Sequence, residues 1–172
     1  MAKAKKAATA SLSMADRDGW IWYDGKMVPW RDATTHVLTH TLHYGMGVFE
    51  GVRAYKTVSG TQIFRLREHM QRLLNSAKVY RMNHTRQLDE LCGAATELVG
   101  RSGLQQCYLR PIMFRSLDEA HPAFGVNPFP NPMTCYIGAW DWGKYLGDAA
   151  IDYPRLSRQP PQHLSGLRPA DA

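Results

Sequence analysis

The chain has 172 residues, 44% of them hydrophobic, and a formal net charge of +6. This length and composition are enough for one folded domain with a real core, and they exclude a wholly disordered chain. No apolar run is long enough to span a bilayer, so we expect a cytoplasmic protein with no membrane partner. The positive charge comes without a zinc-finger, RNA-recognition or basic-helix pattern, so we expect no nucleic-acid partner. Binding of an anionic small molecule is enough to account for that positive charge.

Residues 1–18 are expected to form a flexible basic tail. The first part of this tail, residues 1–13, reads M-A-K-A-K-K-A-A-T-A-S-L-S and contains no acid. A segment of such low complexity has too few large apolar side chains to pack against a core.

Asp24 and Gly25 separate two short apolar runs, at residues 20–23 and 26–30. An Asp-Gly pair in this position is a strong signal for a β-hairpin, because a type I′ turn needs positive φ at both central residues. Pro29 has no amide hydrogen to donate, which predicts an edge position for the second strand.

Three histidines give the first functional hypothesis along the chain. The spacing of His36, His40 and His43 would put them on one face of a helix, where they could bind zinc. No acidic general base sits beside them, and their threonine-rich surroundings disfavour a helix. We therefore expect no metal site.

The segment at residues 39–55 reads T-H-T-L-H-Y-G-M-G-V-F-E-G-V-R-A-Y and is dense in aromatic residues and glycines. An extended strand in this segment would place two sets of side chains on opposite faces. One face would carry Val48, Val52 and Ala54, and the other would carry Phe49, Gly51, Arg53 and Tyr55. The second face aligns a ring, a cation and a phenol with a gap at Gly51, as a small-ligand pocket requires. A core strand with an exposed arginine is the alternative interpretation.

Two helices are predicted from the spacing of apolar residues. A short strand at residues 63–66 precedes a helix at about 67–81, and a second helix follows at about 86–101. The buried stripe of the first helix would be Met70, Leu73, Leu74, Ala77 and Tyr80. The buried stripe of the second would be Leu88, Leu91, Ala95, Leu98 and Val99. Gly103 is predicted to cap the second helix.

Two further strands are predicted at residues 107–114 and 133–140, separated by a proline-containing loop. Tyr108 and Arg110 are two residues apart, so their side chains project from the same face of the first of these strands. A phenol beside a guanidinium makes a good receptor for a carboxylate. The alternative is an ordinary polar outer face of a sheet.

The order of these elements predicts an α+β fold, a mainly antiparallel sheet with two helices on one face. The three cysteines, Cys92, Cys107 and Cys135, are far apart and form no C-x-x-C motif, as is typical of reduced thiols. Cys107 and Cys135 fall within predicted strands, where we expect them to act as small hydrophobic residues.

Three sequence blocks occur in a familiar order, H-Y-G-x-x-V-F-E-G-x-R, then F-R-L-R-E-H-M-Q-R-L, then Y-L-R-P. With them, residues 19–147 resemble the N-terminal part of a branched-chain amino acid aminotransferase, a fold-type IV pyridoxal-phosphate enzyme. The resemblance implies a small N-terminal α+β domain at residues 19–140 and an interdomain linker at 141–147. It also implies a homo-oligomer, at least a dimer.

The resemblance implies an activity and roles for individual residues. The activity is transfer of the amino group of leucine, isoleucine or valine to 2-oxoglutarate, in branched-chain amino acid biosynthesis. Arg72, in the M-Q-R-L block, would bind the phosphate of the cofactor, pyridoxal 5′-phosphate, a role that suits the planar guanidinium fork. The implied substrate-binding residues are Tyr44, Phe49, Gly51, Arg53, Tyr108, Arg110 and Tyr145.

We find no family pattern after Gly147. Residues 148–172 contain four prolines and no apolar periodicity, which predicts a disordered tail. In the family, the domain that follows the linker carries the lysine that holds the cofactor, and no lysine follows Lys144. We therefore expect a chain truncated by a frame change or an early stop, and inactive by itself.

Two other functions are compatible with the residues. One is a non-catalytic α/β module that holds an anionic ligand through Arg53, Arg72 and Arg110. The other is a basic nucleic-acid-binding protein, whose affinity would depend steeply on salt.

Overall fold

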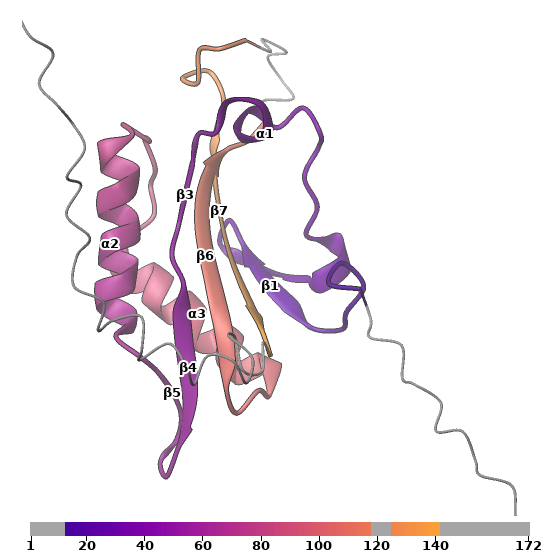
Figure 1. Ribbon diagram of the computed structural model, residues 1–172, viewed down its shortest axis with the longest axis vertical. Helices are drawn as coiled ribbons and strands as arrows, with labels where there is room; N and C mark the ends of the chain where they lie inside the picture. Colours follow the sequence, from indigo (N-terminus) through magenta and orange to yellow (C-terminus); the bar gives the residue numbers. More distant parts are fainter. Residues whose placement is uncertain (1–12, 118–124, 142–172) are drawn as a thin grey trace, which may run out of the picture. The chain divides into compact units, whose positions relative to one another are not determined.

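The computed structural model describes residues 13–117 and 125–141, which form one antiparallel sheet with helices α2 and α3 on one of its faces (Figure 1). The strands are β1 (Trp20–Tyr23), β2 (Lys26–Pro29), β3 (Gly47–Phe49), β4 (Val52–Thr57), β5 (Gly60–Ile63), β6 (Cys107–Arg115) and β7 (Met133–Trp140). The helices are α1 (His40–Tyr44), α2 (Leu66–Val79) and α3 (Leu88–Ser102), with a 3-10 helix at Trp30–Asp32.

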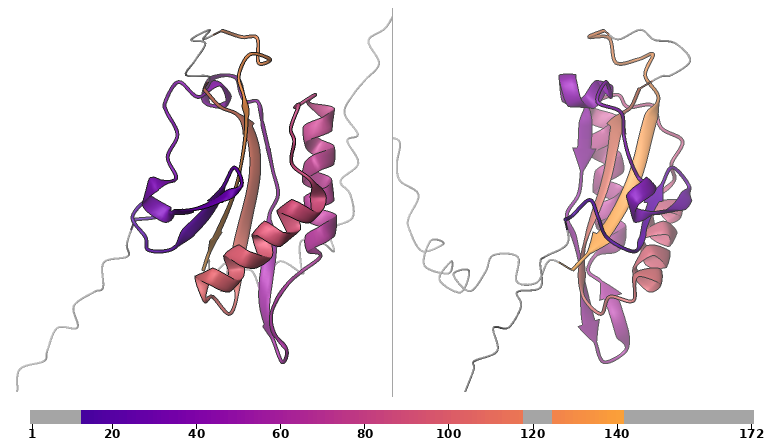
Figure 2. Two further views of the ribbon diagram at one scale, coloured as in Figure 1. Left: turned by 180° about the vertical axis from the view of Figure 1, so that it is seen from behind. Right: turned by 90° about the vertical axis from the view of Figure 1, so that its right-hand side faces the viewer.

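The sheet has the strand order β2-β1-β7-β6-β4-β5, with β3 also pairing with β6. The views of Figure 2 show the helices on one side of the sheet, and the segment that leads from β2 to α1 on the other. The predicted α+β fold is therefore confirmed. None of the helices in the described part of the chain is long and apolar enough to cross a membrane.

The predicted hairpin is confirmed by the geometry of its turn. Asp24 and Gly25 have φ values of 47° and 96°, the positive values that a type I′ turn requires. The Asp24 carboxylate also accepts a hydrogen bond from the amide of Cys135 at 2.9 Å, which ties the turn to β7. Pro29 ends β2, the strand at one edge of the sheet, as its missing amide hydrogen predicts.

Pro111 lies in β6, the strand that pairs with both β3 and β4. It interrupts the pairing, so the single strand that we expected is divided into β3 and β4. Both strands pair with β6 in the same antiparallel register, and between them Glu50 lies opposite Pro111. The amide of Glu50 donates to the carbonyl of Pro111 at 3.0 Å. Proline has no amide hydrogen to return the bond, so the ladder is interrupted at this pair.

The predicted strand at residues 63–66 is wrong in position, because β5 occupies Gly60–Ile63. The hairpin between β4 and β5 turns through only two residues, Val58 and Ser59, so the strand starts earlier than the turn-rich sequence suggested.

The two long helices agree with their predicted apolar stripes apart from one residue. Tyr80 was expected to be buried, but it is 52% exposed because α2 ends at Val79 and the chain then turns away. Helix α3 begins at Leu88, two residues later than expected. Its first turn is closed by a capping box, in which the side chains of Gln87 and Glu90 bond each other's backbone amides.

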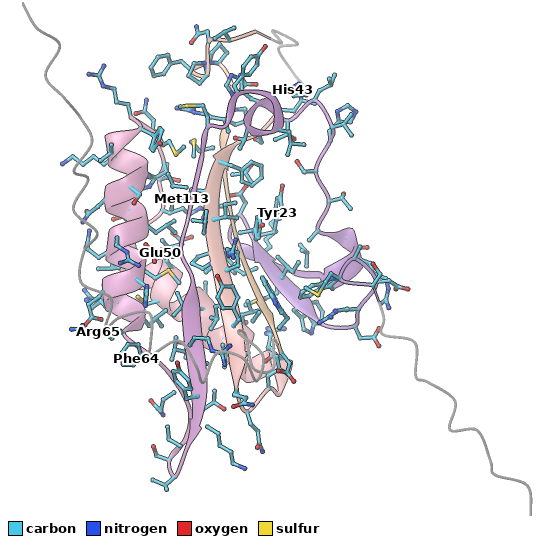
Figure 3. The ribbon with its side chains drawn as sticks, in the orientation of Figure 1. Tyr23, His43, Glu50, Phe64, Arg65 and Met113 are labelled. Atoms are coloured by element: carbon cyan, nitrogen blue, oxygen red, sulfur yellow. The ribbon has the colours of Figure 1, made fainter. Side chains whose placement is uncertain are left out.

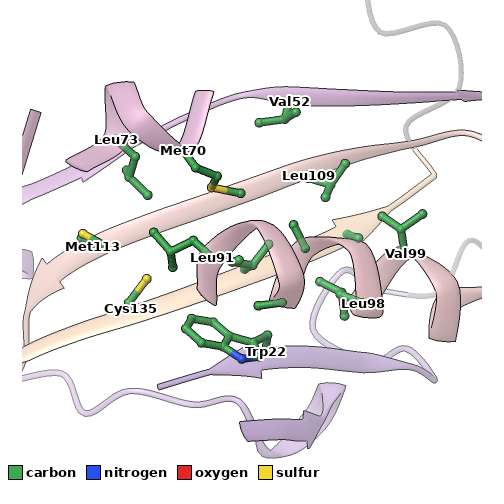
Figure 4. Close-up of a cluster of buried hydrophobic side chains, with 14 of the residues drawn as sticks. Trp22, Val52, Met70, Leu73, Leu91, Leu98, Val99, Leu109, Met113 and Cys135 are labelled. Atoms are coloured by element: carbon green, nitrogen blue, oxygen red, sulfur yellow. The ribbon is translucent and has the colours of Figure 1, made fainter. Parts of the chain in front are cut away.

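The core lies between the sheet and the two long helices (Figure 4). Its largest fully buried aliphatic side chains are Met70, Leu73, Leu91, Leu98, Leu109, Met113 and Ile137. Cys107 and Cys135 are buried in it as free thiols, as expected. Burial raises the pKa of Cys107 to about 11 and that of Cys135 to about 12, so both thiols stay protonated and unreactive at neutral pH.

Candidate functional site

Strand alternation divides the functional side chains between the two faces of the sheet. Val48 and Val52 point into the core beneath the helices, so the residues between them alternate in direction. We call the sheet face turned away from α2 and α3 the open face. The side chains that β3, β4 and β6 direct to it include Phe49, Arg53, Tyr55, Tyr108 and Arg110.

Arg110 is the centre of a cluster on the open face. Its Nε and Nη2 atoms donate hydrogen bonds to the hydroxyl oxygen of Tyr108 at 3.1 and 2.9 Å. Its Cζ atom lies 4.5 Å from the centroid of the Phe49 ring, a cation–π distance. Nη1 of Arg110 donates to no acceptor among the described residues, so one edge of the guanidinium is left for a ligand.

Gly51 makes room for this cluster. A Cβ atom at Gly51 would lie 2.6 Å from the hydroxyl oxygen of Tyr108, far inside van der Waals contact. The gap that the sequence predicted at Gly51 is therefore filled by the phenol that Arg110 holds. Strand alternation predicted that Phe49 and Gly51 share a face, as do Tyr108 and Arg110, and the pairing of β3 and β4 with β6 brings the two pairs together.

Arg53 lies at the margin of the cluster. It is the cross-strand partner of Tyr108, and its Cζ atom is 5.7 Å from the centroid of the Tyr55 ring. Its Nη1 atom is buried and has no hydrogen-bond partner among the described residues. Arg53 therefore retains one buried donor next to Tyr108.

A cavity of about 270 Å³ adjoins the cluster on the open face. The rings of Trp140 and Tyr108 lie 5.3 Å apart, and Trp140 also lines the cavity. The other lining residues are Ile21, Tyr23, Trp30, Ala33, Thr34, Thr35, Phe114, Tyr136 and Gly138. Burial raises the pKa of Tyr136, so its phenol stays neutral in this mainly apolar space.

Arg72 belongs to a second cluster, on the side of the sheet that carries α2. Its Nε and Nη2 atoms donate to the two carboxylate oxygens of Glu50 at 2.6 and 2.7 Å. Nδ1 of His69 lies 2.9 Å from the same carboxylate. Burial raises the pKa of Glu50, but the hydrogen bonds from Arg72 and His69 outweigh it and hold that pKa below its usual value.

A pocket of about 330 Å³ opens beside Arg72 and is lined by Phe64, Arg65, Glu68, His69 and Arg72. Figure 3 shows Glu50 between the strand and α2, with Phe64 and Arg65 near one end of that helix. The Arg65 guanidinium bonds Glu68 at 3.1 Å. Two guanidinium groups and an imidazole around one small pocket are suited to a phosphate monoester.

Of the two remaining predicted site residues, the structure describes only Tyr44. Tyr44 is in α1, which packs at the Arg115 end of β6, and its ring centroid is 4.6 Å from that of His40. Tyr145 lies outside the described residues.

The three histidines are held apart by different backbone partners. Nε2 of His40 is 3.3 Å from the Val126 carbonyl, and Nε2 of His43 is 2.9 Å from the Val37 carbonyl. Nδ1 of His36 accepts from a backbone amide two residues away. The described part of the chain contains no group of three or more His, Cys, Asp or Glu residues that could hold a metal ion.

Glu50 and His69 were not predicted as site residues from the sequence. Both lie within blocks that carried the resemblance, and His69 is three residues before Arg72 on the same helix. The i,i+3 spacing could have indicated that these two side chains share a face. Their common partner, Glu50, is 22 residues from Arg72, and only the docking of α2 on the sheet brings it there.

Comparison with known proteins gives a consistent family. The model of the amino-transferase class IV family matches residues 47–168, which extends past Gly147, where we expected the resemblance to end. The branched-chain-amino-acid aminotransferase of Pseudomonas aeruginosa is 50% identical over 140 residues, which cover 81% of this chain and 44% of that protein.

Two solved structures are similar to this fold. The branched-chain amino acid aminotransferase of Escherichia coli has a TM-score of 0.70 and 42% identity over 78% of this chain and 43% of its own. The T.th. branched-chain amino acid aminotransferase complexed with N-(5′-phosphopyridoxyl)-L-glutamate has a TM-score of 0.69 and 48% identity, over 75% of this chain and 42% of its own. The chain thus spans less than half the length of these relatives. Because the family match covers well over half of this chain, the chain belongs to the class IV amino-transferases.

Proposed function

We propose that this chain supplies the substrate face and the cofactor-phosphate contact of a branched-chain amino acid aminotransferase. The observation that carries the proposal is the arrangement of Arg110, which is fixed by Tyr108 and Phe49 and keeps one guanidinium edge without an acceptor among the described residues. The names of the similar proteins support the same activity.

The pocket beside Arg72 fits the phosphate of pyridoxal 5′-phosphate. Nη1 of Arg72 donates to no acceptor among the described residues, so an anion could take that edge of the guanidinium. The phosphopyridoxyl compound in the T.th. enzyme supports this choice of cofactor. When bound, pyridoxal phosphate supplies an electron sink that makes the Cα proton of an amino acid acidic.

The open face explains how one pocket could accept two kinds of side chain. Phe49, Tyr108 and the adjoining cavity offer apolar walls for a branched aliphatic chain. The Nη1 edge of Arg110 would take the distal carboxylate of glutamate or 2-oxoglutarate. Gly51 keeps the space that the Tyr108 phenol needs to hold Arg110 in this orientation.

We include Tyr44, Arg53 and Tyr145 in the proposed substrate site on the resemblance alone. We also propose a homo-oligomer and a cytoplasmic location, as is typical of this family. Because no lysine follows Lys144, the test below measures binding and does not depend on turnover.

The test compares 2-oxoglutarate with 4-methyl-2-oxopentanoate, which differ in the distal carboxylate. We expect Arg110→Lys to weaken 2-oxoglutarate binding about 10-fold, because the bidentate fork is lost, and to leave 4-methyl-2-oxopentanoate nearly unaffected. Titration calorimetry on the 172-residue chain measures both affinities.

Arg101→Lys is the matched control, since Arg101 pairs with Glu97 on the exposed side of α3. The proposed role of Arg110 is wrong if both ligands lose affinity equally, or if neither does.

A further inference from the structure

Glu50 is a buried carboxylate to which the proposed substrate and phosphate contacts assign no part. It is 5% exposed and lies in the break between β3 and β4, next to two site residues, Phe49 and Gly51. Because side chains alternate along the strand, Glu50 points away from the open face and toward α2. A carboxylate buried this deeply needs strong partners to remain ionised.

Arg72 meets Glu50 along one edge of its guanidinium. The Nε and Nη2 atoms each bond a separate carboxylate oxygen, at 2.6 and 2.7 Å, which is the side-on bidentate geometry. This contact fixes the plane of the guanidinium and the direction of its opposite end. Nη1, at that opposite end, donates to no acceptor among the described residues, and the Arg72 side chain as a whole is 67% exposed.

His69 fixes the carboxylate from a second side. A carboxylate ion can only accept hydrogen bonds, so Nδ1 of His69 must carry the hydrogen that lies between it and Glu50, 2.9 Å away. His69 and Arg72 are one turn apart on α2, and they hold the carboxylate from the same helix face. The Glu50 carboxylate is therefore held by Arg72 and His69 at the same time.

We propose that Glu50 is a positioning residue, which holds the Arg72 guanidinium so that its Nη1 end faces the pocket and receives a phosphate monoester. His69 is the second clamp on the same carboxylate. This inference rests on the proposed function, since it assumes that Arg72 meets the cofactor phosphate.

A purely electrostatic effect of Glu50 and a positioning effect predict opposite changes in phosphate affinity when the carboxylate is removed. Glu50 places a negative charge next to a site that would bind an anion. If its only effect were electrostatic, removing the charge would strengthen phosphate binding. If it positions Arg72, removing one acceptor from the bidentate pair lets the guanidinium rotate, and binding weakens.

The experiment is a fluorescence titration of the 172-residue chain with pyridoxine 5′-phosphate, which cannot react with lysines. Pyridoxine, which lacks the phosphate, serves as the reference ligand. We expect Glu50→Gln to weaken binding of the phosphate ester about 10-fold, the usual cost of losing a supporting partner, and to leave pyridoxine unchanged. Equal or tighter binding of the phosphate ester overturns the proposal.

Glu97→Gln is the matched control, because Glu97 also accepts from an arginine, at 2.8 Å, but on the exposed side of α3. It changes the net charge by the same amount and should leave both affinities as they are. An equal loss of affinity in this variant would show that the effect does not depend on the contact between Glu50 and Arg72, and would overturn the positioning role.

A second measurement separates this inference from the proposed function. In the free protein, the Nε–H group of Arg72 should exchange slowly with solvent, as seen by nitrogen-15 NMR, and should exchange fast in Glu50→Gln. If the wild-type chain does not bind the phosphate ester, or Arg72→Lys binds it equally well, the cofactor role of Arg72 is wrong. In that case the exchange rate of the Arg72 Nε–H group still tests the positioning role by itself. Equal rates in the wild type and in Glu50→Gln overturn it.

Discussion

Gly51 shows how a single missing methyl group shapes the open face. The Tyr108 hydroxyl occupies the space that any other side chain at this position would need. Because that hydroxyl also receives two hydrogen bonds from Arg110, the orientation of the guanidinium depends on the absence of a Cβ atom at residue 51.

Gly51→Ala should therefore displace the phenol. We expect a loss of about 1 kcal/mol in the free energy of unfolding, since a flexible side chain can move aside, and weaker binding of 2-oxoglutarate. Gly93→Ala, in α3 with no atom near the added Cβ, should instead stabilise the chain by about 0.5–1 kcal/mol. Urea unfolding measures both changes, and equal effects of the two substitutions would contradict the crowding at Gly51.

Glu50 gives a prediction for stability against pH. Its pKa is lowered from the ordinary value of 4.5 in the folded chain, so the ionised form contributes stability above that value. This contribution is lost as the pH falls through the folded-state pKa. Glu50→Gln should thus be less stable than wild type by about 1 kcal/mol at neutral pH, a modest cost because Arg72 is largely exposed.

The difference between wild type and Glu50→Gln should shrink as the pH falls below 4.5. Unfolding in urea between about pH 7 and pH 3 measures it. Glu97→Gln, which removes a half-exposed carboxylate, should show a much smaller difference. A difference for Glu50→Gln that stays constant over the whole range would mean that its pKa is the same in the folded and unfolded chain.

Single residues were predictable from sequence where a fixed period decides the outcome. The two-residue period of a strand was enough to group Phe49 with Gly51, and Tyr108 with Arg110. It could not reveal that Glu50 pairs with Arg72, because that contact depends on how a helix docks on the sheet.

At the scale of whole elements, the two long helices end in different ways. Gly103 ends α3 with a φ of 66°, a left-handed conformation that glycine adopts freely. After α2, Arg81 takes the equivalent conformation with a φ of 53°, although its Cβ atom makes this unfavourable.

Arg81→Gly should therefore stabilise the chain, by about 1 kcal/mol, whereas Gly103→Ala should destabilise it by a similar amount. Thermal unfolding of the two variants measures the opposite shifts. Arg101→Ala serves as a control for loss of an arginine at an exposed helical position. Destabilisation by Arg81→Gly would show that the arginine side chain contributes more than its backbone strain costs.

Elements with a strong apolar period were predictable, and their ends were less so. The stripes of α2 and α3 follow from their spacing, but Tyr80 lies beyond the last turn of α2 and is exposed. The strand predicted at residues 63–66 is displaced because the chain turns through Val58 and Ser59 alone, a tighter turn than the turn-forming residues of this segment suggest. The break at Pro111 needed the register of β6, which only pairing with β3 and β4 establishes.

The molecule as a whole has two unlike sheet faces. The long helices cover one face, whereas the other presents aromatic side chains and the cavity beside Trp140. An apolar surface of this kind favours association with other apolar surfaces. The helices on one face were predictable from the apolar periodicity of the sequence, but the cavity depends on the segment around Trp30 folding back on the sheet.

The open face should bind anilinonaphthalene sulfonate and increase its fluorescence. Phe49 and Phe64 are equally exposed, at 58%, but Phe49 lies next to Arg110 on the open face, whereas Phe64 lines the pocket beside Arg72. We therefore expect Phe49→Ser to reduce the fluorescence, and Phe64→Ser to leave it nearly unchanged. Equal reductions would mean that the dye does not distinguish the two faces.

Phe49, Glu50 and Gly51 are consecutive residues, yet they contribute to clusters on opposite faces of one sheet. A substitution at any of them changes one cluster and spares the fold, but an inserted or deleted codon reverses the direction of every side chain up to the next turn. Such an insertion or deletion would turn the Glu50 carboxylate toward Arg110 and away from Arg72. We expect this segment to accept changes of residue type during evolution far more readily than changes of length.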